Sequence, residues 1–417
     1  MLKNIPLSSL ELGMFVHKMN GGWFDHPFWK AKFLIDEPQK LQTLKSSALT
    51  SVVIDTSLGK DVEEEQALRN AGTNAKATKA KRLNAITRRQ STREQTSRPV
   101  STAAELGAAQ ALANNASAKL KDIFRAAHLG RAISVSSVAP IVGDIQASID
   151  RNSQAFHGLM RCKLKSEFVY RHSLCVSALM ISLARKMNLS SKETTDAGLA
   201  GLLLDIGTSY YPKTINPPHG DFSQLDPEIW HQHVQLGHRA LRYDEEVSDW
   251  ALHACLHHHE RMDGKGFPEG LREIDISVGG RMAAICDTFN FLLNDGGGGS
   301  PLDPSTAVKT MRQMEGAFDP DILRKFIESV GQFPVGSFVR LRSGFLGMVI
   351  DENPLVAARP LVEVFYSLAE GKRIAQRRIK LGDGLNDDEI LDTADLSGLD
   401  LPDEGYLREV VFLAAHR

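Results

Sequence analysis

The sequence predicts a mainly α-helical protein: an all-α helical bundle preceded by a small α+β module and followed by a small β-rich extension. Apolar residues recur at helical spacing through most of residues 103–333. Residues 1–60 hold short apolar runs between turn residues, and after Pro334 apolar and polar side chains alternate with a period of two. The length of 417 residues suits two or three domains, which we place at 1–60, 103–333 and 334–417, with a linker at 61–102.

The composition is that of a soluble globular protein. Hydrophobic residues make up 42% and charged residues 24%, and the net charge of −2 carries no information on nucleic-acid binding. The cysteines form no CxxC pair, so we expect reduced thiols in the core: Cys162, Cys175, Cys255 and Cys286. No stretch is apolar enough for a signal peptide or for the ~20 residues of a membrane span. We therefore expect a cytoplasmic protein.

The first 60 residues have the pattern of a compact module. Short apolar runs predict strands over 14–17, 33–35 and 52–55, and residues 38–47 predict a short helix. These elements are too few for a large core, so we expect a small α+β unit.

Residues 61–102 have the composition of a linker. Between Arg69 and Arg98 the sequence carries nine basic residues and one acidic residue, with no aromatic side chain. A flexible, solvated linker is favoured over a nucleic-acid or membrane contact, because no aromatic or apolar face accompanies the charge. We therefore predict no DNA binding.

The helical part begins with an alanine-rich segment, and helical spacing continues over 103–164. The next helix, over 167–187, places His172 on an apolar stripe. Ser190 to Glu193 has the spacing of a capping box, which predicts the start of another helix. That helix follows the apolar run AGLAGLLL and ends on Asp205.

Two further helices carry histidines. Asp226-Pro227 predicts a helix start, with Asp as the N-cap and Pro in the first turn, and this helix carries His233. The helix over 246–260 places His258 on its apolar face, with His259 beside it.

The other flank of that helix holds His253 and His257, which we expect to face solvent. A helix over 281–293 follows, in which Asp287 comes directly after an apolar run, and residues 304–330 are again helical.

The last part of the chain predicts a small sheet. Strands are expected over 338–341 and 347–350, around a turn at 342–344, and over 361–365. The acidic tail from Asp383 is expected either to lie on the surface or to cover a sheet edge.

Six metal-competent side chains recur at about one per helix and loop: His172, Asp205, His233, His258, His259 and Asp287. A helical bundle can direct such groups to one internal point. Nitrogen and carboxylate ligands without thiolate suit iron, manganese or zinc. Any one of these histidines alone is more often a core or surface residue. Together they predict a site where two metals share a carboxylate and clamp a phosphate.

These residues carry a resemblance to a known family. YRHS, LLLDIG, HVQLG and HHERMDGKGFP followed by Asp287 resemble the HD-GYP subgroup of the HD metal-dependent phosphohydrolases. Residues 1–60 look similar to the small domain of unknown function found ahead of such domains. The resemblance implies hydrolysis of cyclic di-GMP with bound iron or manganese. It also implies that the loop Gly266-Phe267-Pro268 contacts diguanylate cyclase (GGDEF) domains.

The resemblance also implies two ligand sets, and one of them is incomplete. Asp205 would bridge both metals, with His233, His258 and His259 on one and with His172 and Asp287 on the other. Where the family has the histidine of its His-Asp pair, this sequence has Leu204. Further departures from the family pattern stand at Phe168, Thr208, Phe267 and Asn290. We therefore expect one or two divalent ions, with one held tightly.

Two functional hypotheses remain open at this point. In the first, the protein is a cyclic di-GMP phosphodiesterase in which Asp205 is catalytic and Lys213 or Lys265 meets substrate phosphate. In the second, it is an impaired module that binds metal or nucleotide, or docks cyclase-type partners through the loop from Lys265 to Gly270. A purely structural role ranks last, because so many buried imidazoles and carboxylates would need partners. Whether the protein forms a homodimer is left open.

Overall fold

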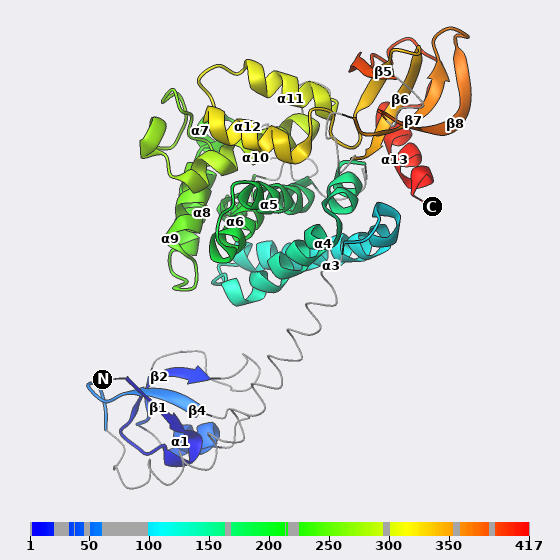
Figure 1. Cartoon of the computed structure of the whole chain (residues 1–417). Helices are drawn as coiled ribbons and strands as arrows, with labels where there is room; N and C mark the ends of the chain where they lie inside the picture. Colours follow the sequence, from blue (N-terminus) through cyan, green and yellow to red (C-terminus); the bar gives the residue numbers. More distant parts are fainter. Residues whose placement is uncertain are drawn as a thin grey trace. The chain divides into compact units, whose positions relative to one another are not determined.

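A computed structural model describes most of the chain and divides it into two compact units, Met1–Gln95 and Thr96–Arg417 (Figure 1). The described residues are 2–20, 33–36, 38–45, 51–60, 99–162, 168–212, 214–215, 225–294, 301–352, 359–382 and 388–416. Among them, no helix has both the length and the apolar character to cross a membrane. The expected linker lies largely outside the described residues.

The first unit is a four-stranded antiparallel sheet with one α-helix. The strands are β1 (Leu2–Pro6), β2 (Phe15–Asn20), β3 (Phe33–Leu34) and β4 (Ser51–Asp55), in the order β1-β4-β2-β3, and the helix is α1 (Pro38–Lys45). Alternate strand residues such as Val16, Val52 and Ile54 are fully buried. The three predicted strands and the helix are present. The first strand was not predicted, because its apolar residues are interrupted by polar ones.

The second unit is mainly helical, as predicted. Its helices are α3 (Thr102–His128), α4 (Val135–Cys162), α5 (Phe168–Lys186), α6 (Ser191–Leu203), α7 (Pro227–Trp230), α8 (Gln232–Leu241), α9 (Asp249–His257), α10 (Val278–Asn294), α11 (Pro304–Gln313) and α12 (Pro320–Val330). Short 3-10 turns η3 (Ile206–Tyr210) and η6 (Glu273–Asp275) connect them.

Helices α5 and α6 form the centre of the bundle. The predicted capping box starts α6: the Ser190 hydroxyl accepts from the Glu193 N–H at 3.2 Å, and the Glu193 carboxylate accepts from the Ser190 N–H at 2.8 Å. Gly201 lets α6 approach α5 closely, since a Cβ there would lie 2.6 Å from the Cα of Ser177. The end of α6 is therefore held against the helix that carries His172.

Two sequence expectations for the helices are wrong. Residues 304–330 form two helices, because the chain turns at Gly316 with φ 69° and Asp319 caps a new helix. His257, expected to face solvent, is buried. It packs closely against α10 at Gly280, where an added Cβ would lie 2.9 Å from the Cβ of His257. His253 is exposed as expected.

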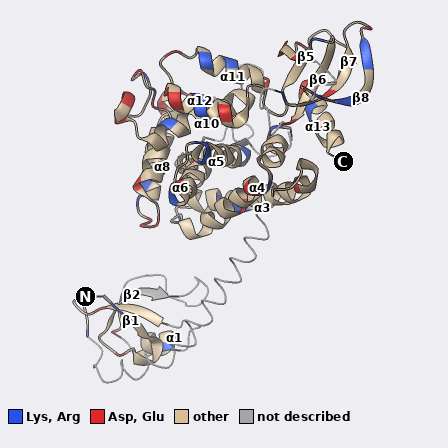
Figure 2. Cartoon of the chain, viewed as in Figure 1, with Lys and Arg blue, Asp and Glu red and all other residues tan. Residues whose placement is uncertain are grey.

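The C-terminal part is a five-stranded antiparallel sheet in the order β8-β7-β6-β5-β9. Its strands are β5 (Phe338–Leu341), β6 (Phe345–Asp351), β7 (Leu361–Ser367), β8 (Lys372–Lys380) and β9 (Ile390–Thr393). The first three were predicted. Strand β8 is a basic edge strand (blue in Figure 2), and it has too few apolar residues to be predicted from the sequence. Strand β9 pairs with β5, so the tail covers a sheet edge.

The chain ends in a helix that was not predicted, α13 (Glu404–Ala415). Its Phe412 is fully buried against α4, where a Cβ at Gly158 would lie 2.6 Å from the ring. Buried residues of the sheet and of the helices belong to one continuous core. The boundary near residue 333 therefore stays a sequence prediction.

Candidate metal centre

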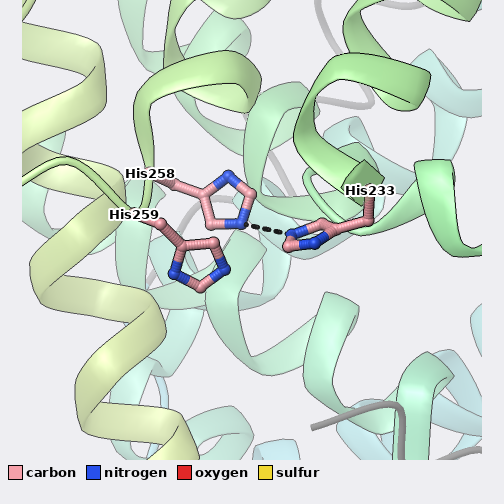
Figure 3. Close-up of side chains that lie close together, drawn as sticks. All are labelled: His233, His258 and His259. Atoms are coloured by element: carbon pink, nitrogen blue, oxygen red, sulfur yellow. Dashed lines mark hydrogen bonds between the residues drawn. The ribbon is translucent and has the colours of Figure 1, made fainter. Parts of the chain in front are cut away.

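Three histidines converge at the ends of α8 and α9. His233 lies in the first turn of α8, and His258 and His259 follow directly after α9 (Figure 3). Their ligand nitrogens all lie within 4.8 Å of one another. His233 and His258 are 0% and 1% exposed, so the cluster is inside the bundle.

Backbone carbonyls fix the orientation of two of these rings. The Nδ1–H of His233 donates to the Trp230 carbonyl at 2.6 Å, and that of His258 donates to the Cys255 carbonyl at 2.8 Å. With Nδ1 engaged by a carbonyl, Nε2 is the nitrogen of each ring that remains to serve as a metal ligand. These two atoms face each other at 3.2 Å (dashed in Figure 3). Both atoms could ligate one cation placed between them.

Burial keeps His233 and His259 in the neutral form that binds metals. Burial, and then the neighbouring His258, lower the pKa of His233 to about 3, so its ring is neutral at pH 7. Burial also holds the pKa of His259 well below its usual value. The Nε2 of His259 is buried and has no hydrogen-bond partner within the described residues. An uncharged, unpartnered nitrogen beside two others fits a divalent cation.

Asp205 stands between the histidine cluster and His172. Its Oδ1 lies 3.5 Å from His233 Nε2, and its Oδ2 lies 3.4 Å from His172 Nε2. Burial raises the pKa of Asp205, and His172 opposes that effect. The carboxylate is therefore placed to serve two neighbouring cations at once.

Asp287 on α10 and His172 on α5 form a close pair. His172 Nε2 lies 2.9 Å from Asp287 Oδ1, and His172 Nδ1 donates to Asn290 Oδ1 at 2.8 Å. Burial opposes ionisation of both groups, yet their mutual contact raises the pKa of His172 and lowers that of Asp287. Asp287 Oδ2 is 3.9 Å from His259 Nδ1, so this pair adjoins the cluster.

The turn η3 holds Asp205 against α8. A Cβ at Gly207 would lie 1.8 Å from the carbonyl oxygen of His233, so only glycine permits this approach. Thr208 donates its hydroxyl to the Asp205 carbonyl at 2.7 Å, which closes the turn. The local sequence DIGT therefore sets the distance between Asp205 and His233.

The structure brings all six predicted ligand-type residues into one site, and it places the other expected residues differently. Leu204 is 1% exposed and belongs to the hydrophobic core, where it offers no ligand atom. Lys265 is exposed and lies 3.9 Å from Asp263, outside the six-residue site. Lys213 lies outside the described residues.

The loop Gly266-Phe267-Pro268 packs against the site. The Phe267 ring stacks on His259 at a centroid distance of 4.6 Å and on His231 at 3.8 Å. Gly266 is required because a Cβ there would meet backbone atoms of residues 259–261 at 2.5 Å. The Phe267–Pro268 peptide bond is cis.

Buried Glu260 fixes the far end of this loop. Its carboxylate accepts from the N–H groups of Glu269, Gly270 and Leu271 at 2.7, 3.1 and 3.0 Å. Sequence reasoning missed Glu260, and it noted Asn290 only as a departure from the family pattern and not as the acceptor that orients His172. The position of Asn290, three residues after Asp287 on the same helix, was the available signal.

Known family models and proteins match this chain over both of its units. The HD domain family model matches residues 151–322, and a domain of unknown function (DUF3391) matches residues 2–138. The chain is 37% identical over 392 residues to a protein of Pseudomonas aeruginosa named cyclic di-GMP phosphodiesterase PA4108, covering 94% of this chain and 92% of that protein.

Other relatives match a shorter stretch. A protein of Thermotoga maritima named cyclic di-GMP phosphodiesterase is 29% identical over 161 residues, which cover 38% of this chain and 44% of that protein. A 3'3'-cGAMP-specific phosphodiesterase 1 of Vibrio cholerae is 31% identical over 131 residues, covering 31% of this chain and 30% of the relative. The solved structure of Bd1817, an HDG"Y"P protein of Bdellovibrio bacteriovorus, aligns with a TM-score of 0.45 at 19% identity, over 79% of this chain and 99% of that one.

Proposed function

Because the chain belongs to the HD-GYP type of HD-domain protein, the family of the cyclic di-GMP phosphodiesterase PA4108, we propose that it hydrolyses cyclic di-GMP. In this reaction water adds to phosphorus, the P–O3' bond breaks, and the released 3'-oxygen takes up a proton. The first product is the linear dinucleotide, and a second hydrolysis would yield GMP.

The observation that carries the proposal is the convergence of His172, Asp205, His233, His258, His259 and Asp287 in one buried site. Burying this many imidazoles and carboxylates is costly unless they are paired or bound to cations. The facing Nε2 atoms of His233 and His258, 3.2 Å apart, support the cation-bound form.

We propose that divalent iron or manganese is the cofactor. His233, His258 and His259 would hold one ion with Asp205, and His172 and Asp287 would hold a second ion with the same Asp205. When bound, such ions act as Lewis acids toward a phosphate and lower the pKa of water. Asn290 and the carbonyls of Trp230 and Cys255 keep the imidazoles oriented with Nε2 toward the site.

The chain's own residues also define what can enter the site. Asp205 and Asp287 keep 12% and 11% of their side chains exposed, and His259 keeps 19%. The reacting phosphate is therefore expected to approach from the side of these three residues. Phe267 borders the same side of the site through its ring contact with His259.

A second candidate function is a catalytically impaired module that binds metal or nucleotide, or docks diguanylate cyclase-type partners. Leu204 favours it, because its buried aliphatic side chain leaves one ligand set with a donor fewer. The loop 266–268 is the proposed docking element. Since the Phe267 ring is packed between His231 and His259, a partner would engage mainly the exposed neighbours, such as Lys265.

The two candidates are separated by an assay of cyclic di-GMP hydrolysis with added manganese(II) or iron(II). The wild type is compared with Asp205→Asn, which should lose turnover by at least ~100-fold because the shared carboxylate is changed. 3'3'-cGAMP serves as the alternative substrate. Robust wild-type turnover supports the phosphodiesterase, whereas activity that emerges only in Leu204→His supports the impaired module.

The metal content of the purified protein provides an independent test of the proposed metal binding. We expect about one tightly held divalent ion per chain, because only the set containing His233, His258 and His259 is complete. Two results together would contradict a metal role. The wild type, prepared without chelator, would contain no metal, and the His258→Ala variant would otherwise behave like the wild type.

A further inference from the structure

Arg171 lies beside the metal centre and plays no part in the ligand sets. It precedes His172 on α5, and its side chain is partly buried. One guanidinium N–H donates to the Oδ1 of Asn294, at the end of α10. This neutral amide is a hydrogen-bond acceptor but does not balance the positive charge of Arg171.

Within the described residues, Arg171 has no carboxylate at ion-pair distance. Three other partly buried arginines of this unit do have one: Arg151 pairs with Glu105 at 2.7 Å, Arg281 with Asp319 at 2.7 Å, and Arg408 with Asp303 at 3.5 Å. Arg161 also has none among the described residues, but its guanidinium lies over the Phe289 ring at 5.7 Å. A guanidinium withdrawn from water without a counter-charge is unfavourable, and an anionic ligand would compensate it.

A short hydrogen-bond network joins Arg171 to the metal centre. The Nδ2 of Asn294 donates to Asn290 Oδ1 at 3.1 Å, and the same oxygen accepts from His172 Nδ1 at 2.8 Å. The guanidinium is thus connected to His172 through two amide side chains. The network places the guanidinium two side chains away from His172.

We propose that Arg171 forms a phosphate-binding subsite next to the metal centre and takes a phosphate group of the cyclic dinucleotide. The inference rests on the proposed function. A cyclic dinucleotide carries two phosphates, so when one occupies the metal centre the other needs a cation nearby. The planar guanidinium fork matches phosphate oxygens in a bidentate contact.

Arg171 suits this role better than the lysine expected from the sequence. Lys265 has a side chain 80% exposed and lies 3.9 Å from Asp263, so water and that carboxylate already satisfy it. Arg171 instead combines partial burial, a hydrogen bond to Asn294 and no carboxylate at ion-pair distance in the described part of the chain. A phosphate would be bound more strongly by Arg171 than by Lys265, because less water competes for the contact with a partly buried cation.

The test measures steady-state hydrolysis of cyclic di-GMP by the manganese-loaded full chain. Arg171→Ala is expected to raise KM by about 10-fold to 100-fold, the cost of one lost charge-assisted hydrogen bond. Arg171→Lys should recover part of this loss, since it keeps the charge and loses the fork. Metal content should equal that of the wild type in both variants, because neither removes a ligand.

Arg185→Ala is the matched control, since Arg185 lies on the same helix and pairs with Asp150 at 2.8 Å. It should leave KM and metal content unchanged. An Arg171→Ala variant with wild-type KM, or one that loses metal and kcat at constant KM, overturns the inference while the proposed function stands.

Binding of a hydrolysis-resistant phosphorothioate analogue of cyclic di-GMP provides a second measurement. Weaker binding by Arg171→Ala supports the subsite even if turnover is slow, and equal binding overturns it. A wild type that neither binds nor hydrolyses the dinucleotide overturns both the proposed function and the subsite.

Discussion

His259 differs from the other two histidines of the cluster in how its ring is held. His233 and His258 each donate a hydrogen bond to a backbone carbonyl, whereas the Nδ1 of His259 lies 3.9 Å from Asp287 and its Nε2 has no hydrogen-bond partner within the described part of the chain. The ring of Phe267 lies 24° from parallel to it, at 4.6 Å. Ring stacking therefore takes over the orienting role that hydrogen bonds have at the other two residues.

We predict that Phe267→Ala weakens metal binding by about 10-fold to 100-fold, the usual effect of losing an orienting contact behind a metal ligand. Phe267→Tyr should bind like the wild type, because it keeps the ring. The measurement is the manganese content after equilibrium dialysis over a range of free metal. If Phe267→Ala retained metal as well as Phe267→Tyr does, stacking would not be what holds His259.

At the scale of elements, the site depends on how closely η3 approaches α8. The approach brings Asp205 within 3.5 Å of His233, and Gly207 permits it. The two residues are far apart in the sequence, so their distance is set by packing and not by local conformation.

Gly207→Ala is predicted to destabilise the protein by about 3 kcal/mol, because the added methyl group forces apart two packed backbones. Gly143→Ala on α4 is the control, since a Cβ there meets nothing within 4 Å. It should be neutral or stabilising by ~0.5–1 kcal/mol, as for an unobstructed helical glycine. Denaturant unfolding measures both, and equal stabilities would contradict the close approach.

At the scale of the whole molecule, the sheet and the bundle of the second unit share one core. Phe412 on α13 is 0% exposed and reaches α4 at Gly158, while Tyr406 on the same helix is 59% exposed. The end of the chain is therefore part of the helical unit's stability.

Phe412→Ala should cost about 3–5 kcal/mol, as for a buried aromatic side chain truncated in a core. Because the core is continuous, the loss should lower the midpoint at which the helical signal unfolds, monitored by circular dichroism. Tyr406→Ala on the same helix should change that midpoint little. A variant Phe412→Ala that leaves the helical transition in place would show that the sheet unfolds independently.

The sequence by itself determined the mainly helical class, the capping box at Ser190 and the six metal-competent residues. Each of these depends on patterns that local chemistry imposes over a few residues, such as helical spacing and cap geometry. The same patterns did not predict α13, whose Phe412 packs against the distant helix α4. The break within 304–330 was missed although its signals, Gly316 and the Asp319 cap, are local.

Only the tertiary structure decided which donors face one another. It set the 3.2 Å approach of His233 and His258, stacked Phe267 on His259, buried His257, and left Arg171 without a carboxylate among the described residues. Sequence spacing shows which face of a helix a residue occupies, but the distance between two helices depends on the volume and shape of all the side chains packed between them.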